Sequence, residues 1–390
     1  MGKKRISRRE RSPEAENDDA ASNAFEYREI EDPGEIRLIK VHQRGKHIGV
    51  RLEHYDLDNA PDYSALSYTW GDATRIREIM VNRRQFPVRL NLYQFLEVFQ
   101  ARHQNEWLWV DQICINQADT QERNSQVQLM SEIYRNAFEV KIWLGPDDHP
   151  DPRIFRERIR GTSASRSMKQ EALGEMFSNP YWGRLWILQE ILLARRLKIY
   201  HGFDFIDWSS FQLLCDPDHK DALVNAPEHV RWMARRATSA RQILVCDAIL
   251  HCTDNDCTDP RGKIYGIQSL LLHKHRLKVD YAKRVEHVFL QAAIMIAKSK
   301  VCTIDEGHEM VCPDAPAECE CPPWGEMEFI VRSIGQLAYA MGLTNSPMAH
   351  RWPELEDIMQ QFRHDPNADN KVQCLAKLRD HFSLPEYKID

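Results

Sequence analysis

Residues 107–117 read WLWVDQICINQ, and this stretch decides the fold class. Its first four residues, 107–110, are apolar strand formers, which is typical of a strand buried on both faces. Asp111 follows at the point where such a strand ends. A carboxylate at the carboxyl end of a parallel strand lies where open α/β sheets usually build their sites. A simpler interpretation, in which Asp111 caps a loop beside a core strand, stays open.

The chain on either side of this stretch alternates between expected strands and helices. Apolar runs predict further strands at 36–41, 48–54, 64–70, 78–82, 87–90, 140–144 and 197–201. Helical spacing predicts one helix with Asn91 as its N-cap and another with Asp119 and Glu122 at capping-box spacing. Two further helices are expected over 171–178 and 181–194. Strands separated by helices indicate crossover connections. The sequence therefore predicts an α/β fold with a central, mostly parallel sheet flanked by helices.

Composition changes along the chain predict four regions. Residues 1–25 form a polar tail that we expect to be disordered, and 26–205 form the α/β core. Residues 206–300 continue it with helices, and 301–390 hold an irregular Cys- and Pro-rich loop followed by a mainly helical C-terminal part. The tail carries a basic cluster with three possible interpretations: it is simply solvated, it is a nuclear-import signal, or it contacts an anionic surface. This cluster consists of Lys3, Lys4, Arg5, Arg8, Arg9 and Arg11.

The overall composition excludes several classes of protein. The chain has 390 residues, 43% hydrophobic and 28% charged, which is normal for a globular protein. Its net charge of −6 gives no field that attracts nucleic acid. No apolar run reaches the roughly 18–20 residues of a membrane span, and the N-terminus lacks an apolar signal core. Ten scattered cysteines favour reduced thiols. We therefore expect no nucleic-acid partner and a cytoplasmic location, with the nucleus as the alternative.

Common catalytic and metal-binding signatures are missing from the sequence. It contains no phosphate loop, dinucleotide fingerprint, nucleophile elbow or His-Glu-x-x-His run. Two cysteine groups lack the paired spacing of structural zinc sites, so buried or loop thiols are the simpler interpretation. We expect no metal and no tightly bound cofactor. These groups are Cys302, Cys312, Cys319 and Cys321, and Cys246, Cys252 and Cys257 with His251.

Glu190 is the most informative single residue. The helix expected over 181–194 is apolar on all sides, and such a helix is normally buried. A carboxylate inside it costs several kcal/mol unless it is paired or protonated. Glu190 is therefore either a member of an ion pair, with Arg184 or Arg123 as partner, or a functional acid with a raised pKa.

Three blocks of sequence resemble, in order, the heterokaryon-incompatibility (HET) domain of filamentous fungi. They are YSALSYTWGD at 63–72, WLWVDQICINQ at 107–117 and RLWILQEI at 184–191. The segments TDPRGKIYG at 258–266 and VDY at 279–281 look like later parts of the same pattern, and the resemblance covers roughly 35–290. It implies a role in nonself recognition and regulated cell death, with protein partners or self-association. We interpret Asp259-Pro260-Arg261 as an element that pins a loop.

A more distant resemblance concerns Trp186 and Glu190. Their spacing is similar to the Trp-Cys-x-x-Glu stretch of TIR domains, although Ile187 stands where those domains have Cys. This resemblance implies a TIR-like or flavodoxin-like core and NAD as substrate. Glu190 would then be catalytic for cleavage of the bond between nicotinamide and ribose, with Asp111 in the same crevice.

The same resemblance implies a set of substrate-binding residues. An aromatic ring would stack on the substrate and Gly71 would allow a close approach of the backbone. The residues are Trp70, Gly71, Asp72 and Trp186, with Tyr68 as a further aromatic candidate. The rival hypothesis is a non-catalytic interaction module. The two hypotheses differ in what they require of Glu190. An enzyme needs its carboxylate open to a pocket, whereas an interaction module allows the carboxylate to be sealed in an ion pair.

Overall fold

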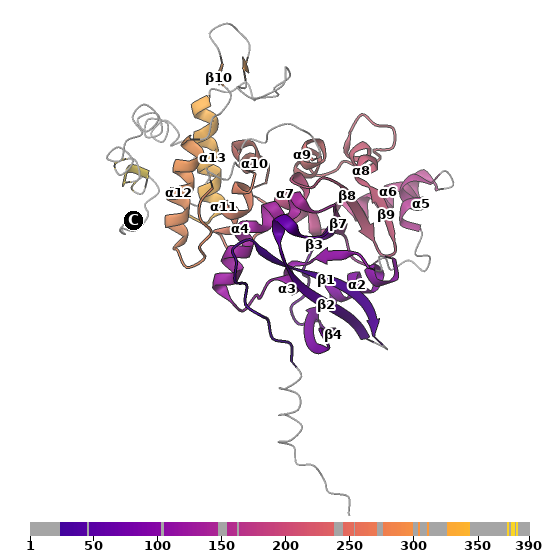
Figure 1. Ribbon diagram of the computed structural model, residues 1–390. Coiled ribbons are helices and arrows are strands. Elements are labelled where there is room, and N and C mark those ends of the chain that lie inside the picture. The colour runs from indigo at the N-terminus through magenta and orange to yellow at the C-terminus, as the bar shows by residue number, and fades with distance from the viewer. Residues whose placement is uncertain are drawn as a thin grey trace, which may run out of the picture.

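The computed structural model has a mixed α/β fold built on one nine-stranded sheet (Figure 1). It describes residues 24–44, 47–102, 105–146, 154–161, 164–237, 245–252, 254–270, 276–298 and 326–343, together with 303–304, 310–311, 373, 376–378 and 380. The strands of the sheet are β1 (Glu35–Arg44), β2 (His47–Asp56), β3 (Tyr63–Tyr68), β4 (Ile76–Val81), β5 (Arg84–Arg89), β6 (Trp107–Trp109), β7 (Glu139–Trp143), β8 (Leu197–His201) and β9 (Asp204–Asp207).

The centre of the sheet is parallel. Across the sheet the order is β5-β4-β2-β1-β6-β3-β7-β8-β9, and β6, β3, β7 and β8 all run in one direction. Numbered by their order in the chain, these four strands lie as 2-1-3-4. Every residue of β3, β6 and β7 is buried, as expected for strands covered on both faces. The carboxyl ends of these strands therefore meet at one edge, where Tyr68, Trp109 and Trp143 end their strands.

The outer part of the sheet corrects the prediction of a mostly parallel sheet. β1 is antiparallel to both β2 and β6, and β4–β5 and β8–β9 are antiparallel hairpins. The cause is the length of the connections, because a parallel pair needs a crossover of a dozen or more residues. Only Asn82 and Arg83 join β4 to β5, both with positive φ, and only Gly202 and Phe203 join β8 to β9.

The helices fall into two groups. α2 (Leu90–Arg102), α3 (Asp111–Cys114), α4 (Thr120–Asn136), α5 (Ile154–Arg160), α6 (Arg166–Phe177) and α7 (Ile187–Leu192) connect the central strands. Later in the chain come α8 (Trp208–Cys215), α9 (Glu228–Arg236), α10 (Val245–Cys252), α11 (Gly262–Gln268), α12 (Val285–Lys298) and α13 (Glu326–Ala340). Figure 1 shows α10 to α13 gathered together beside the sheet.

Two expected N-caps have different outcomes. The Asp119 carboxylate accepts hydrogen bonds from the backbone N–H groups of Gln121 and Glu122 and caps α4 as predicted. α2 begins at Leu90, one residue before the expected cap, so Asn91 is not its cap. The Asn91 amide instead donates to the Thr69 carbonyl and accepts from Trp143 Nε1 at 2.9 Å. Asn91 thereby ties the carboxyl ends of β3 and β7 together.

The helix expected over 181–194 is interrupted. A 3-10 turn covers Pro180–Gly183, Arg184 is extended with φ −78° and ψ 136°, and α7 spans only six residues. The reason is a long-range pairing, in which Leu185 N–H donates to the Asp256 carbonyl at 3.0 Å and Asp256 N–H donates to the Gly183 carbonyl at 2.5 Å. These bonds replace helical ones, and the extended residue carries its guanidinium towards Glu190.

The N-terminal boundary of the packed domain supplies a first prediction. Phe25 N–H donates to the Gln85 carbonyl at 3.0 Å, and its ring contacts Tyr27 and Phe86 at centroid distances of 5.0 and 5.8 Å. A chain beginning at residue 24 should unfold at the same temperature as the full chain. A chain beginning at residue 28 should have a free energy of unfolding lower by about 2 kcal/mol, because the side chains of Phe25 and Tyr27 are removed from the core. Thermal melts of the three chains check this, and three equal melting temperatures would contradict it.

Candidate functional site

Glu190 lies at the carboxyl end of the central strands, in α7. Its side chain is 2% exposed. The Ser67 hydroxyl of β3 donates to Glu190 Oε2, and the same hydroxyl lies 2.6 Å from the Tyr181 hydroxyl. Arg184 Nη1 approaches Glu190 Oε2 at 3.5 Å. Burial raises the pKa of Glu190, and Arg184 and the Ser67 hydroxyl oppose that rise. Of the two arginines expected to pair with Glu190, Arg184 does so. The guanidinium of Arg123 lies over the ring of Tyr281 instead.

Asp111 follows the end of β6 with only Val110 between them, near the strand end that the sequence predicted, and begins the short helix α3. Its carboxylate accepts one hydrogen bond from Trp70 Nε1 and another from the backbone N–H of Gln112, both at 2.7 Å. Burial raises the pKa of Asp111, while Trp70 and Arg184 lower it. The Asp111 carboxylate therefore caps the local turn, as the simpler interpretation expected, and it also lies near Arg184.

Arg184 acts electrostatically on both carboxyl groups. Although burial opposes its charge, Glu190 and Asp111 raise the pKa of Arg184. The Arg184 side chain is 19% exposed, against 2% for Glu190. Ser67 and Tyr68 are neighbours on β3 and point to opposite faces of the sheet. Glu190 meets Ser67, and Asp111 lies beside Tyr68. The arrangement is a guanidinium paired with Glu190 and close enough to Asp111 to act on its charge, at the end of one strand.

The expected substrate-binding residues occupy different surroundings. Trp70 is half-buried, and the Arg89 guanidinium lies over its ring, 4.9 Å from the centroid. Gly71 has φ +75°, a conformation that favours glycine, and its carbonyl accepts from Arg89 Nη1 at 2.8 Å. The exposed Asp72 carboxylate accepts two hydrogen bonds from Thr74, which lower its pKa. Trp70 and Gly71 are thus connected to Asp111, whereas Asp72 holds its own loop.

Trp186 lies against the later helices. The space above Gly262 and Gly266 of α11 is filled by Cys257, Leu185 and the Trp186 indole, and added Cβ atoms would lie 3.5 and 3.8 Å from that indole. The Trp186 ring therefore packs on the glycine face of α11, where an added Cβ at Gly262 would collide with Cys257 Sγ and one at Gly266 would make ordinary contacts. This packing fixes the segment that carries Arg184, at the N-terminal side of α7.

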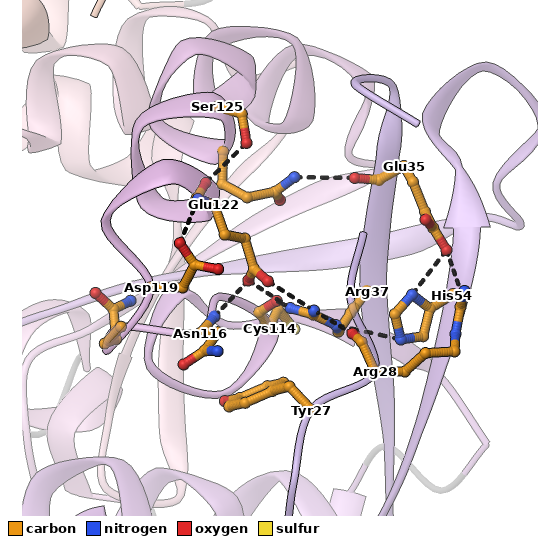
Figure 2. A network of polar contacts seen from close by, with 12 residues as sticks. Tyr27, Arg28, Glu35, Arg37, His54, Cys114, Asn116, Asp119, Glu122 and Ser125 are labelled. Atoms are coloured by element: carbon orange, nitrogen blue, oxygen red, sulfur yellow. Dashed lines mark hydrogen bonds and ion pairs between the residues drawn. The ribbon is translucent and has the colours of Figure 1, made fainter. Parts of the chain in front are cut away.

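A second buried charge cluster escaped the sequence analysis (Figure 2). Arg37 of β1 is fully buried and donates through both terminal nitrogens to the carboxylate of Glu122, at 2.6 and 2.8 Å. Its remaining N–H groups reach the carbonyls of Cys114 and Arg28 and the Nε2 atom of His54. Burial and the neighbouring Arg37 lower the pKa of His54, which keeps Nε2 able to accept. All five donors of the guanidinium are used, which is typical of a structural pair.

The Asp259-Pro260-Arg261 element and the cysteine groups remain to be placed. Arg261 donates to both carboxylate oxygens of Asp259 at 2.8 and 2.6 Å and to the carbonyl of Lys283 at 2.6 Å, so this element pins a loop as interpreted. Within the described ranges, no three His, Cys, Asp or Glu side chains gather as metal ligands. Cys302, Cys312, Cys319 and Cys321 lie outside those ranges. None of the helices that the structure describes is long and apolar enough to span a membrane.

Comparison with known proteins gives a family match over part of the chain. Residues 63–190 match the family model described as heterokaryon incompatibility protein (HET). The matched segment begins at the first residue of β3 and ends at Glu190. It therefore contains three of the four central strands, β3, β6 and β7, and both acidic residues of the site.

A curated relative agrees with this assignment. The chain is 38% identical over 155 residues to heterokaryon incompatibility protein 6, OR allele, of Neurospora crassa. The aligned part covers 35% of this chain and 23% of the relative, so the chain spans about a quarter of that protein's length. No solved structure matches the chain.

Proposed function

We propose that this chain acts in heterokaryon incompatibility as an effector of regulated cell death, and that its chemistry is cleavage of NAD between nicotinamide and ribose. The family match supports the first part of the proposal. The observation that carries the second part is the buried Glu190 at the carboxyl end of β3, held by Ser67 and Arg184. A desolvated acid with a raised pKa is typical of functional sites.

The strand order supports a TIR-like relation. The 2-1-3-4 order of β6, β3, β7 and β8 is the order of flavodoxin-like sheets. In such sheets, ligands bind outside the carboxyl ends of the strands, next to the first strand. β3 is the first of these strands here, and it is followed by Trp70 and Gly71. Trp186 and Glu190 keep the Trp-x-x-x-Glu spacing, with Ile187 as the departure.

The proposed reaction needs few groups. The bond between the ribose anomeric carbon and the nicotinamide nitrogen breaks, and its electron pair neutralises the positive ring, which leaves as nicotinamide. Water adds to the anomeric carbon and loses a proton, so the products are ADP-ribose, nicotinamide and one proton. The Glu190 carboxylate stabilises the positive sugar centre when Arg184 is displaced from it. Asp111 accepts the proton from water.

A second candidate function rests on a specific observation. Glu190 is 2% exposed and lies 3.5 Å from Arg184, which is the sealed arrangement that a non-catalytic interaction module permits. In that case the cluster stabilises the fold, and the surface recruits protein partners or further copies of the chain. The two candidates give opposite results in an assay with NAD.

Asp111→Asn tests the proposal. Purified full-length protein should release nicotinamide from NAD, and the variant should release it at least about tenfold more slowly, because Asn cannot accept a proton from water. Glu97→Gln, an exposed change on α2, is the control and should keep the full rate. Release is followed by chromatography over time at several protein concentrations. A wild-type protein that releases no nicotinamide would favour the interaction module instead.

A further inference from the structure

The loop of residues 254–261, between α10 and α11, holds the backbone immediately before α7. The Asn255 side-chain amide donates to the carbonyls of Trp182 and Arg184 at 3.1 and 3.2 Å. Asp256 adds two backbone hydrogen bonds, to the two residues that flank Arg184. A loop that lies some seventy positions later in the chain therefore determines where the Arg184 backbone lies.

The two helices on either side of this loop hold Asn255 in turn. Asn255 is 6% exposed, and its N–H donates to the carbonyl of Cys252, the last residue of α10, at 3.1 Å. Its carbonyl accepts a hydrogen bond from the Nζ atom of Lys263, which is 7% exposed and belongs to α11. α11 also packs against α7. Asn255 thus connects both helices to the segment that carries Arg184.

The contact between Arg184 and Glu190 depends on this support. Arg184 Nη1 lies 3.5 Å from Glu190 Oε2, which is the upper limit for a hydrogen bond. A contact of this length holds a side chain weakly, so the extended backbone at Arg184 largely determines the position of the guanidinium. Arg184 is 19% exposed and Glu190 only 2%, so Arg184 is the member of the pair that can move towards solvent.

We propose that Asn255 is a positioning residue that holds Arg184 on Glu190, and that the 254–261 loop thereby keeps the site in a closed, inactive state. This role rests on the proposed function, in which Glu190 acts only after Arg184 is displaced. The loop lies outside residues 63–190, the segment that matches the family model. A shift of α10 or α11 would then activate the site without any change in the residues that contact substrate.

The rate of nicotinamide release from NAD tests the closed state. Asn255→Leu keeps the size of the side chain and removes both hydrogen bonds that it donates. It should raise kcat by about fivefold or more, because the loss of one such bond shifts a two-state equilibrium by this amount. A residue that only stabilises the fold would lower kcat or leave it unchanged when it is replaced.

Gln268→Leu is the matched control for the loss of a buried amide. The Gln268 side chain is 2% exposed and makes hydrogen bonds to both backbone groups of Leu277. This variant should unfold at lower urea and release nicotinamide no faster than wild type. Asn255→Ala removes the same donors as Asn255→Leu with a smaller side chain. It is measured in parallel, so the result does not depend on how Leu fits.

A measurement without NAD tests the positioning itself. A double-mutant cycle of Arg184→Met and Glu190→Gln, followed by urea unfolding, gives the coupling free energy between the two side chains. In the Asn255→Leu background this coupling should fall to less than half of its wild-type value. In the Gln268→Leu background it should be unchanged. An equal coupling in all three backgrounds would refute the positioning role of Asn255.

These outcomes are separate from those of the proposed function. No nicotinamide release from any of the proteins, with a coupling that falls in Asn255→Leu, would refute the catalysis and support the positioning by Asn255. Release by wild type that does not become faster in Asn255→Leu or Asn255→Ala would support the catalysis and refute the closed state, whatever the coupling.

Discussion

Arg37→Met is expected to destabilise the protein by about 3–5 kcal/mol, the largest loss of stability that we predict for a single side chain. The Glu122 side chain is 6% exposed, and Arg37 neutralises it at 2.6 and 2.8 Å. Removal of the guanidinium leaves a buried carboxylate without a counter-charge, which is far more costly than the loss of a surface pair. It also leaves the carbonyls of Cys114 and Arg28 without their donor. Urea unfolding measures the effect.

Two further variants make this prediction specific. Arg135→Met removes a pair with Glu132 whose side chains are 39% and 34% exposed, and should cost less than about 1 kcal/mol. The double variant Arg37→Met/Glu122→Leu removes both buried charges and should recover part of the loss. An Arg37→Met protein with an unchanged unfolding free energy would show that this pair does not stabilise the fold.

Glu190→Gln is expected to abolish both the toxicity of the expressed protein and its consumption of NAD. Gln keeps the volume and can still meet the Ser67 hydroxyl, but it lacks the charge that stabilises a positive sugar centre. The variant should stay folded, because Asp111 remains as a counter-charge for Arg184. We expect a loss of stability of no more than about 2 kcal/mol, below that of breaking an isolated buried pair. A viability assay, NAD levels and a melting curve together measure the outcome.

Glu139→Gln is the matched control, because it changes a buried carboxylate away from the site. Glu139 binds Lys141 at 2.7 Å and Lys198 at 3.0 Å on β7 and β8. This variant should lose stability and keep its toxicity. A folded and fully toxic Glu190→Gln protein would refute the catalytic role. An inactive Glu190→Gln protein that is destabilised by more than about 3 kcal/mol would favour the structural role of the ion pair.

Local signals predicted the elements of the fold well. The apolar runs located β3, β6, β7 and β8, and Asp119 capped α4 as its spacing indicated. The broken helix before α7 could not be predicted in this way, because the pairing of Gly183 and Leu185 with Asp256 joins segments far apart in the sequence. The mixed sheet could have been recognised from the two-residue connection at Asn82 and Arg83, which is too short for a parallel crossover.

The site was predictable where a charge interrupts an apolar run. Asp111 and Glu190 both do so, and in the structure both act electrostatically on Arg184. Ser67 and Tyr68 carry a weaker signal, since hydroxyls are ordinary in strands and only burial makes them informative. Arg37 gave no local signal at all, because its partner Glu122 lies on a helix 85 residues later in the chain. Such long-range pairs become visible only in the folded arrangement.

The most direct measurement is the rate of nicotinamide release from NAD by the purified protein, compared with that of folded Glu190→Gln. We expect release that rises with the amount of wild-type protein and falls by roughly a hundredfold or more in the variant, because the charge next to the sugar is lost. Equal rates in the two proteins would contradict the account. So would a wild-type protein that is toxic to cells and leaves NAD intact.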